Sequence, residues 1–290
     1  MLKTSVICSG LDKPEEFLHR LQLIAGAGFD AIDLNLQEKA VRLIMDSDEA
    51  MAVADRVRAQ VEASGIEIGQ CHAPYNPYEF KHPEAGPRVI HYVKKSFPFA
   101  KRLGVKDVVV HPMRPRNSTD PLYKHPETFY EWNVSMYTEM VEMANEAGLT
   151  LCTENLFSVT EQRTAIHGFT SSAEDIISLM DAVPGLCVCF DIGHAKLVGL
   201  NPADTVRAFG SRLKLLHLHN NDGVWDLHVS PFELSPIDWE KFGRALNEIG
   251  FTGNINLETD CFINPMPEPL QADAYRYLHS CAKYIASLVK

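Results

Sequence analysis

Short apolar runs alternate with longer amphipathic segments along the whole chain, and a glycine marks most of the junctions. These glycines are Gly28, Gly65, Gly104, Gly148, Gly185 and Gly250. Glycine is the preferred residue just past a helix end because it takes the left-handed conformation at little cost. The segments between the apolar runs are therefore predicted to be helices, for example over 48–64, 126–147 and 272–289.

The apolar runs give eight strand candidates, beginning with T-S-V-I-C near the N-terminus and including L-K-L-L-H-L-H near Lys214. Strands that alternate with helices predict parallel pairing. Eight such units in 290 residues predict an α/β fold with one (β/α)8 TIM barrel over 1–290 and no linker. A doubly wound open sheet is the alternative. No G-x-G-x-x-G follows the first strand, which counts against a dinucleotide-binding version of that sheet.

The connections between strands and helices differ in length at the two ends of the predicted barrel. Helix-to-strand turns are short, whereas strand-to-helix segments at 73–83, 112–126 and 220–236 are long and rich in proline and aromatic residues. Long ordered loops in a compact domain are usually functional. In a barrel they gather at the C-terminal ends of the strands, where barrel enzymes keep their active sites.

Side chains that bind metals stand at or near the ends of these strands. Because strand residues alternate faces, Leu215, His217 and His219 share one face, and Glu154 shares its face with Cys152. The strand-end set is His72, His111, Glu154, Asp191, His217 and Glu258. Buried carboxylates are costly unless they are paired or bind a metal. Several of them converging on one barrel axis predict a divalent cation.

The chain resembles the xylose-isomerase-like barrels, which include sugar (phosphate) isomerases and epimerases and the endonuclease-IV-type nucleases. The resemblance rests on C-H-A-P-Y at His72, V-V-V-H-P at His111, T-E-N at Glu154, F-D-I-G-H at Asp191, L-H-L-H-N-N-D at His217, D-L-H at Asp226 and L-E-T at Glu258. It implies one metal held by Glu154, Asp191, His217 and Glu258. The spacing of the family motif favours His217 over His219 as the ligand.

The resemblance to the nucleases implies further ligands. The matching positions are His72, His111, His194, Asp226 and His228, and all carry suitable residues. One segment departs from the family pattern, since many relatives carry G-E-G before I-D-W. This chain reads F-E-L-S-P-I-D-W from Phe232 to Trp239. We therefore expect a pocket of different shape there.

The predicted reaction is proton abstraction next to a carbonyl, with a metal stabilising the enediolate that forms. Glu154 and Glu258 are assigned as acid and base and also as metal ligands, and His194 is expected beside the substrate oxygens. Carboxylate and imidazole ligands suit Mn, Co or Zn. The expected substrate is a sugar, a sugar phosphate or a related keto-polyol, which makes the protein an isomerase or epimerase.

Loop residues offer contacts for such a substrate. Arg114 and Arg116 follow His111 closely and are candidates to bind a phosphate or a carboxylate. The aromatic rings of Phe157 and Trp225 are candidates to stack on the apolar face of a sugar.

The sequence is also compatible with three other functions. A multi-zinc phosphodiesterase resembling the apurinic endonucleases would use the full histidine set to activate water. A keto-sugar or inosose dehydratase would begin with the same proton abstraction and then lose a hydroxyl. A non-catalytic sugar-binding barrel is the third, because a barrel fold does not dictate function.

Composition and charge indicate which classes of partner and which cellular compartment to expect. A net charge of −11 argues against nucleic acid binding, and no apolar run is long enough for a membrane span. Seven cysteines without C-x-x-C spacing, and an N-terminus unlike a signal peptide, predict reduced thiols in the cytoplasm. By analogy with relatives, a homodimer or homotetramer is expected.

Overall fold

The computed structural model describes residues 1–75, 77–234 and 236–290. Asn76 and Ser235 lie outside the described residues, and Ser235 belongs to the sequence segment from Phe232 to Trp239. The predicted departure from the family pattern in that segment therefore falls partly outside them. Eight parallel strands form one sheet, in the order β10-β1-β2-β3-β4-β5-β8-β9. Their bounds are β1 Thr4–Cys8, β2 Ala31–Asn35, β3 Glu67–His72, β4 Asp107–Val109, β5 Thr150–Glu154, β8 Cys187–Asp191, β9 Leu213–His217 and β10 Ile255–Leu257.

The sheet nearly closes on itself between β9 and β10. Leu218 and Leu257 form a parallel bridge. The backbone N–H of Leu218 donates to the carbonyl of Asn256 at 2.9 Å, and that of Glu258 donates to the carbonyl of Leu218 at 3.1 Å. The sequence prediction of a (β/α)8 barrel is confirmed, and the open doubly wound sheet is excluded.

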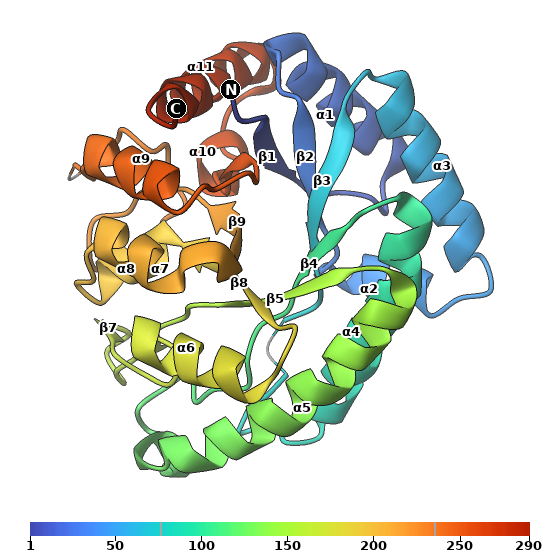
Figure 1. Cartoon of the computed structure of the whole chain (residues 1–290). Helices are drawn as coiled ribbons and strands as arrows, with labels where there is room; N and C mark the ends of the chain where they lie inside the picture. The colour runs from blue at the N-terminus through green and yellow to red at the C-terminus, as the bar shows by residue number, and fades with distance from the viewer. Residues whose placement is uncertain (76, 235) are drawn as a thin grey trace.

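Helices surround the barrel, and the two chain termini lie near each other beside the last helix (Figure 1). The helices are α1 Pro14–Ala27, α2 Lys39–Met45, α3 Ala50–Ala63, α4 Ala85–Leu103, α5 Pro126–Ala147, α6 Ala173–Ala182, α7 Ile192–Leu197, α8 Pro202–Phe209, α9 Trp239–Glu248, α10 Asp260–Ile263 and α11 Glu268–Ser287, with short 3-10 turns at Pro121–Lys124 and Gly210–Arg212. The last helix begins four residues before the predicted 272, with Pro267 as its N-cap. As predicted, Gly148 caps α5 in the left-handed conformation, with φ of 75°.

Two apolar clusters fill the molecule. The large one lies between the strands and the outer helices, and includes Phe97, Phe190 and Phe242. A second, small cluster consists of Val109, Cys152, Cys189 and Leu215. These are the residues that strand alternation places on the same face as His111, Glu154, Asp191 and His217, which is the interior of the barrel. Small side chains there leave room for the polar groups above them.

A two-stranded antiparallel hairpin interrupts the regular alternation after β5. It consists of β6 Ser158–Val159 and β7 Ala165–Ile166. Val159 also forms a parallel bridge to Asn117, in the long segment after β4. The hairpin and this loop therefore form one unit at the C-terminal end of the barrel.

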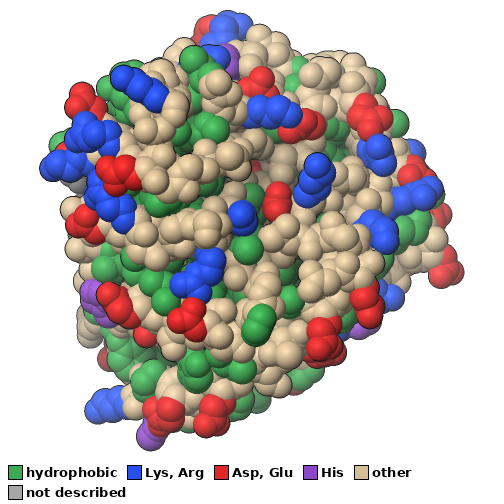
Figure 2. All heavy atoms as spheres, viewed as in Figure 1, with side chains coloured by type: hydrophobic (Ala, Val, Ile, Leu, Met, Phe, Trp, Pro, Cys, Tyr) green, Lys and Arg blue, Asp and Glu red, His purple; other side chains and the backbone are tan. Residues whose placement is uncertain are grey.

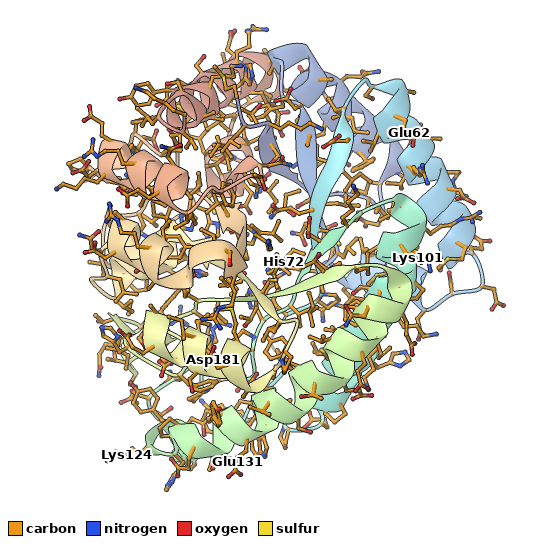
Figure 3. All side chains as sticks on the ribbon, viewed as in Figure 1. Glu62, His72, Lys101, Lys124, Glu131 and Asp181 are labelled. Carbon is orange, nitrogen blue, oxygen red and sulfur yellow. The ribbon has the colours of Figure 1, made fainter. Side chains whose placement is uncertain are left out.

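Side chains at the barrel centre and on its outer ring differ in kind. Figure 3 shows His72 near the centre, whereas Glu62, Lys101 and Glu131 lie on the outer helices. On the face seen in Figure 2, acidic and basic side chains are interspersed rather than gathered in one basic patch.

None of the described helices is both long and apolar enough to cross a membrane. All seven cysteines are unpaired.

Candidate active site

The four residues of the predicted metal set converge at the C-terminal mouth of the barrel. Glu154, Asp191 and His217 end β5, β8 and β9, and Glu258 directly follows β10. Nδ1 of His217 lies 3.5 Å from Glu154 Oε2, 4.0 Å from Asp191 Oδ2 and 3.2 Å from Glu258 Oε2. We call these four residues the central set. Three carboxylates from three different elements thus surround one imidazole nitrogen.

Asn155 fixes the first two carboxylates relative to each other. The side-chain amide of Asn155 donates to the carbonyl of Asp191 at 2.9 Å. In return, the backbone N–H of Asp191 donates to Oδ1 of Asn155 at 2.8 Å. This reciprocal pair ties the end of β5 to the end of β8. The carboxylate of Asp191 in turn accepts the backbone N–H of His194 at 2.7 Å and caps α7. The T-E-N and D-I-G-H stretches therefore build one connected corner of the site.

Asp33 on β2 lies on the opposite side of the His217 ring. Its Oδ2 is 3.3 Å from Nε2 of His217. The same oxygen accepts the side-chain amides of Gln70 and Asn256, each at 2.9 Å. A carboxylate at one ring nitrogen favours the proton there and leaves the lone pair on the other. Nδ1 of His217 is therefore the nitrogen presented to the three carboxylates of the central set.

The central set fits a divalent cation. Glu154, Asp191 and His217 are almost completely buried, and neither ring nitrogen of His217 makes a hydrogen bond, so the carboxylates around the ring contact it only as ion pairs. Although burial opposes it, nearby acidic groups raise the pKa of His217 well above its usual range. The cluster thus attracts positive charge strongly. A metal ion among these oxygens and this nitrogen would satisfy all of them, with carboxylate and imidazole ligands of the kind that Mn, Co and Zn take.

The pKa values of the two glutamates of the central set are shifted in opposite directions. Burial favours a high pKa for Glu154, but the imidazoles of His111 and His217 outweigh it and hold its pKa well below the usual range. Burial raises the pKa of Glu258 above its usual range. Two carboxyl groups whose surroundings separate their pKa values are a common basis for acid and base roles.

A second group of metal-binding atoms lies beside Glu154. Nε2 of His72 and Nε2 of His111 are 3.1 Å apart, and they lie 3.3 Å and 3.1 Å from Glu154 Oε2. The carbonyl of Ala73 lies 2.8 Å from Nδ1 of His72, so a proton on Nδ1 leaves Nε2 as the free lone pair. Burial lowers the pKa of His111 to about 4, against the opposing effect of Glu154.

A third group joins the loop after β9 to α7. Asp226 Oδ2 lies 3.2 Å from Nε2 of His194 and 3.1 Å from Nε2 of His228. Nδ1 of His194 lies 2.9 Å from the carbonyl of Asn155, which orients its ring. One donor atom per residue lies within 4.8 Å of the others in each of three sets, namely His72 with His111 and Glu154, His194 with Asp226 and His228, and Asp191 with His217 and Glu258. The nine residues named from the sequence are therefore brought together at one end of the barrel.

His219 lies between the central set and the third group and contacts a residue of each. Its Nε2 lies 3.1 Å and 3.2 Å from the two oxygens of Asp191. Its ring stacks on that of His228, with centroids 4.1 Å apart and an angle of 5° between planes. Gly193 makes room for it, because a Cβ atom there would lie 1.9 Å from Cε1 of His219. The glycine of F-D-I-G-H thus permits this contact.

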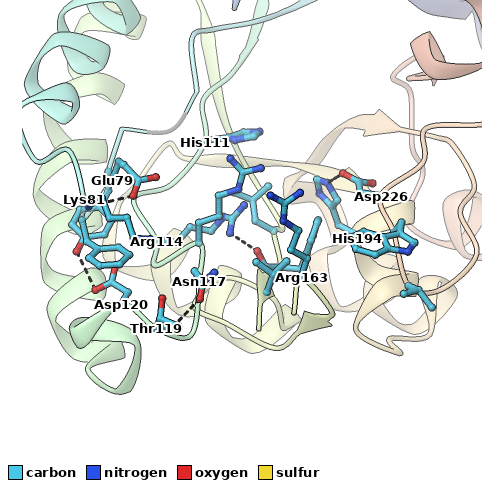
Figure 4. A pocket seen from close by; sticks show the side chains of 18 of the residues that line it. Glu79, Lys81, His111, Arg114, Asn117, Thr119, Asp120, Arg163, His194 and Asp226 are labelled. Carbon is cyan, nitrogen blue, oxygen red and sulfur yellow. Dashed lines mark hydrogen bonds and ion pairs between the residues drawn. The ribbon is translucent and has the colours of Figure 1, made fainter. Parts of the chain in front are cut away.

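A cavity of about 750 Å³ opens beside these groups. His111, His194 and Asp226 line its inner part, and Figure 4 shows them around the space next to Arg114 and Arg163. The four loop residues predicted to contact substrate, Arg114, Arg116, Phe157 and Trp225, all line it as well. Its volume is in the range of small-molecule binding sites.

Two residues of the site were missed by sequence reasoning. Asp33 stands in the middle of a strand, whereas the predicted ligands all stand at or after strand ends. Alternation along A-I-D-L-N does place it on one face with Ala31 and Asn35, which was the available signal. The other residue is Arg163, which lies in a turn whose position no strand pattern indicates.

Comparisons with known proteins agree with this architecture. The model of the family described as "Xylose isomerase-like TIM barrel" matches residues 21–281. The uncharacterized protein y4fM of Sinorhizobium fredii is 22% identical over 95% of this chain and 90% of its own. A solved D-tagatose 3-epimerase-like protein has a TM-score of 0.69 at 21% identity, covering 99% of both chains. A D-psicose 3-epimerase, solved in the presence of D-fructose, has a TM-score of 0.74 at 15% identity, covering 98% of this chain and 99% of its own. At these identities the solved structures show a shared fold. Since the family match spans most of the sequence, the chain belongs to the xylose isomerase-like TIM barrel family.

Proposed function

We propose that the protein is a divalent-metal-dependent isomerase or epimerase of a sugar, a sugar phosphate or a related keto-polyol. The observation that carries the proposal is the convergence of Glu154, Asp191 and Glu258 on the free Nδ1 of His217. This cluster lies at the mouth of the barrel, where the adjoining cavity has room for a small carbohydrate.

In this proposal the central set holds the metal, and its two glutamates exchange protons with the substrate. A bound metal would polarise the substrate's carbonyl and neighbouring hydroxyl oxygens and so acidify the adjoining C–H. Glu154 and Glu258 stand on β5 and after β10, with β8 and β9 between them in the barrel. One carboxylate removes the carbon-bound proton, and the other returns a proton to the opposite face or to the neighbouring carbon. The first outcome is epimerisation and the second is isomerisation.

His194 is assigned to the substrate oxygens. Its ring lines the cavity and is held by the carbonyl of Asn155 and by Asp226. Burial lowers its pKa, but Asp191 and Asp226 raise the pKa well above the usual range, which favours a proton on the ring. Because both ring nitrogens already contact Asn155 and Asp226, an imidazolium in this position would stabilise negative charge on a substrate oxygen through its own positive charge.

The solved relatives support the choice of substrate class. Their names describe a D-psicose 3-epimerase and a 3-keto-D-glucoside 4-epimerase, which act next to a carbonyl of a sugar. We extend that chemistry, and not a particular sugar, to this chain.

The test is exchange of the substrate's carbon-bound proton with solvent. Protein loaded with Mn, Co or Zn is incubated in D2O with a panel of ketoses and ketose phosphates, and deuterium uptake is measured by NMR. We expect uptake at a carbon next to the carbonyl of at least one sugar. No uptake from any of them, on protein shown to carry metal, would overturn the proposal. Loss of a hydroxyl in the product would instead identify the dehydratase variant, and binding without exchange would identify a sugar-binding barrel.

A multi-metal phosphoester hydrolase is the second candidate function. It is favoured by the two further ligand groups, His72 with His111 and His194 with Asp226 and His228, on either side of the central set. Such a cluster could activate water and bind a phosphate. The net charge of −11 argues against a nucleic acid substrate. Hydrolysis of an activated phosphodiester by zinc-loaded protein tests this candidate directly.

We also propose a cytoplasmic location, in a homodimer or homotetramer. The seven unpaired cysteines support a reducing compartment. Fractionation of cells and light scattering of the purified protein test the two statements separately.

A further inference from the structure

The outer part of the cavity is lined by four basic side chains, those of Lys81, Arg114, Arg116 and Arg163. We infer that the substrate carries an anionic group, a phosphoryl or a carboxylate, which Arg114, Arg116 and Arg163 bind while the carbonyl end of the molecule faces the central set. This inference rests on the proposed function and names the substrate class of the same site. It adds Arg163, which has no place in the proposed proton transfer.

The three arginines lie on two chain segments that are hydrogen-bonded to each other, the segment after β4 and the β6–β7 hairpin. The backbone N–H of Val159 in β6 donates to the carbonyl of Arg116 at 2.9 Å, and that of Ser118 donates to the carbonyl of Val159 at 2.8 Å. The hydroxyl of Ser158 donates to the carbonyl of Pro115 at 2.6 Å. The hairpin is thus hydrogen-bonded along the segment that carries Arg114 and Arg116. An arginine on the hairpin is placed relative to the other two by backbone contacts.

Arg163 stands at the tip of that hairpin in an uncommon conformation. Its backbone φ is 66°, a value that residues other than glycine rarely adopt. The turn is closed by hydrogen bonds from Arg163 N–H to the carbonyl of Thr160 and from Thr160 N–H to the carbonyl of Thr164, both at 2.9 Å. Strained backbone of this kind persists where the surroundings impose it. In Figure 4 the side chain of Arg163 lies in the pocket, between Arg114 and His194.

Arg114 is held in place by Phe157, within the group of basic side chains that line the cavity. It donates to the carbonyl of Phe157, and its guanidinium lies 5.8 Å from the centroid of the Phe157 ring. Burial, reinforced by the positive charge of Arg116, lowers the pKa of Arg114 to about 10. An anion in the cavity would relieve this repulsion.

The carboxylates that line the same cavity have other partners and form no ion pair with these arginines. Asp226 lies between His194 and His228, and Asp120 accepts hydrogen bonds from the hydroxyl of Tyr78 and the backbone N–H of Leu122. Glu79 accepts from the backbone N–H of Lys81. Among the residues that the structure describes, no carboxylate forms an ion pair with Arg114, Arg116 or Arg163. Guanidinium groups bind phosphate and carboxylate with paired N–H donors, so this region has the donors and the charge for such a group.

The first test uses inorganic phosphate and acetate as probes of the purified, metal-loaded protein. Calorimetric titration is performed on the wild type, on a double variant with Arg116→Ala and Arg163→Ala, and on Arg244→Ala as a control. Arg244 is an exposed arginine on α9, outside the cavity lining. We expect one of the two probes to bind the wild type and Arg244→Ala equally, and the double variant at least tenfold more weakly. Tighter phosphate binding identifies a phosphoryl group, and tighter acetate binding a carboxylate. No binding, or equal affinity in all three proteins, would overturn the inference.

The second test separates this inference from the proposed function. Solvent exchange is compared between a neutral ketose, its terminal phosphate and the corresponding keto-acid. We expect kcat/KM to be at least tenfold higher for one of the anionic sugars, and the double variant to remove that preference. Equal kcat/KM for neutral and anionic sugars would overturn the inference while supporting the proposed reaction. Absence of exchange from every sugar overturns the proposed function alone, since the phosphate and acetate titrations then still decide whether the arginines bind an anion.

Discussion

Asp33 Oδ2 lies 3.3 Å from Nε2 of His217, on the side of the ring that faces away from the three carboxylates of the central set. The amides of Gln70 and Asn256 hold the same oxygen at 2.9 Å. Four barrel strands therefore combine to orient one imidazole. The arrangement resembles the carboxylate–histidine–metal triads in which a partner carboxylate fixes the ring and raises its basicity.

The first prediction concerns this partner carboxylate. Asp33→Asn removes the negative charge behind His217 while keeping the shape of the side chain. We expect metal affinity to fall about 10–100-fold, as is typical when such a partner is lost. Competition with a fluorescent chelator measures the affinity, and Asp55→Asn, at an exposed aspartate paired with Arg102, is the control. A folded Asp33→Asn protein with unchanged affinity would show that Asp33 does not support the metal.

The second prediction concerns the two glutamates. Glu154→Gln and Glu258→Gln should each lower the rate of solvent exchange at the substrate carbon by at least about 10²-fold, because general acid–base groups contribute roughly 10²–10⁴-fold. Deuterium uptake followed by NMR measures the rate, and Glu142→Gln on α5 is the exposed control. Metal content is determined for each variant in parallel. A variant that keeps both its metal and its exchange rate disproves the acid–base role of that residue.

The third prediction concerns metal stoichiometry and stability. Protein purified without chelators or a histidine tag should contain about one Mn, Co or Zn per chain by elemental mass spectrometry. Since the metal binds only the folded central set, a free concentration of 100 times Kd should stabilise the fold by about 2.7 kcal/mol in urea unfolding. Two or three zinc ions per chain would instead favour the phosphoester hydrolase. Protein without metal, which takes up none on titration, would contradict both functions.

The fourth prediction concerns the contact between α7 and His219. In Gly193→Ala, the new Cβ would lie 1.9 Å from Cε1 of His219, so the ring must leave its place against Asp191. Overpacking of this kind costs about 1–3 kcal/mol. The matched control is Gly26→Ala inside α1, where a Cβ meets nothing within 4 Å, and where alanine is expected to gain about 0.5–1 kcal/mol. Urea unfolding of the two variants compares them. Equal stability would show that His219 moves without cost.

The sequence by itself determined the repeating units and the inward faces of the strands. Both follow from local physics, because glycine ends a helix and side chains alternate along a strand. The barrel, the placement of Cys152 and Cys189 on its inward face, and the meeting of Glu154, Asp191, His217 and Glu258 could therefore be predicted. Strand ends in a parallel barrel meet at one mouth whatever their separation along the chain.

Only the tertiary structure decided which atoms face one another within that mouth. Barrel closure sets Asp33 of β2 against His217 of β9, across 184 residues of sequence that carry no signal of the contact. The bridge between Val159 and Asn117 likewise brings Arg163 to the pocket that holds Arg114 and Arg116. These relationships depend on strand register and loop packing, which arise from many weak contacts between distant segments and leave no periodic pattern in the sequence.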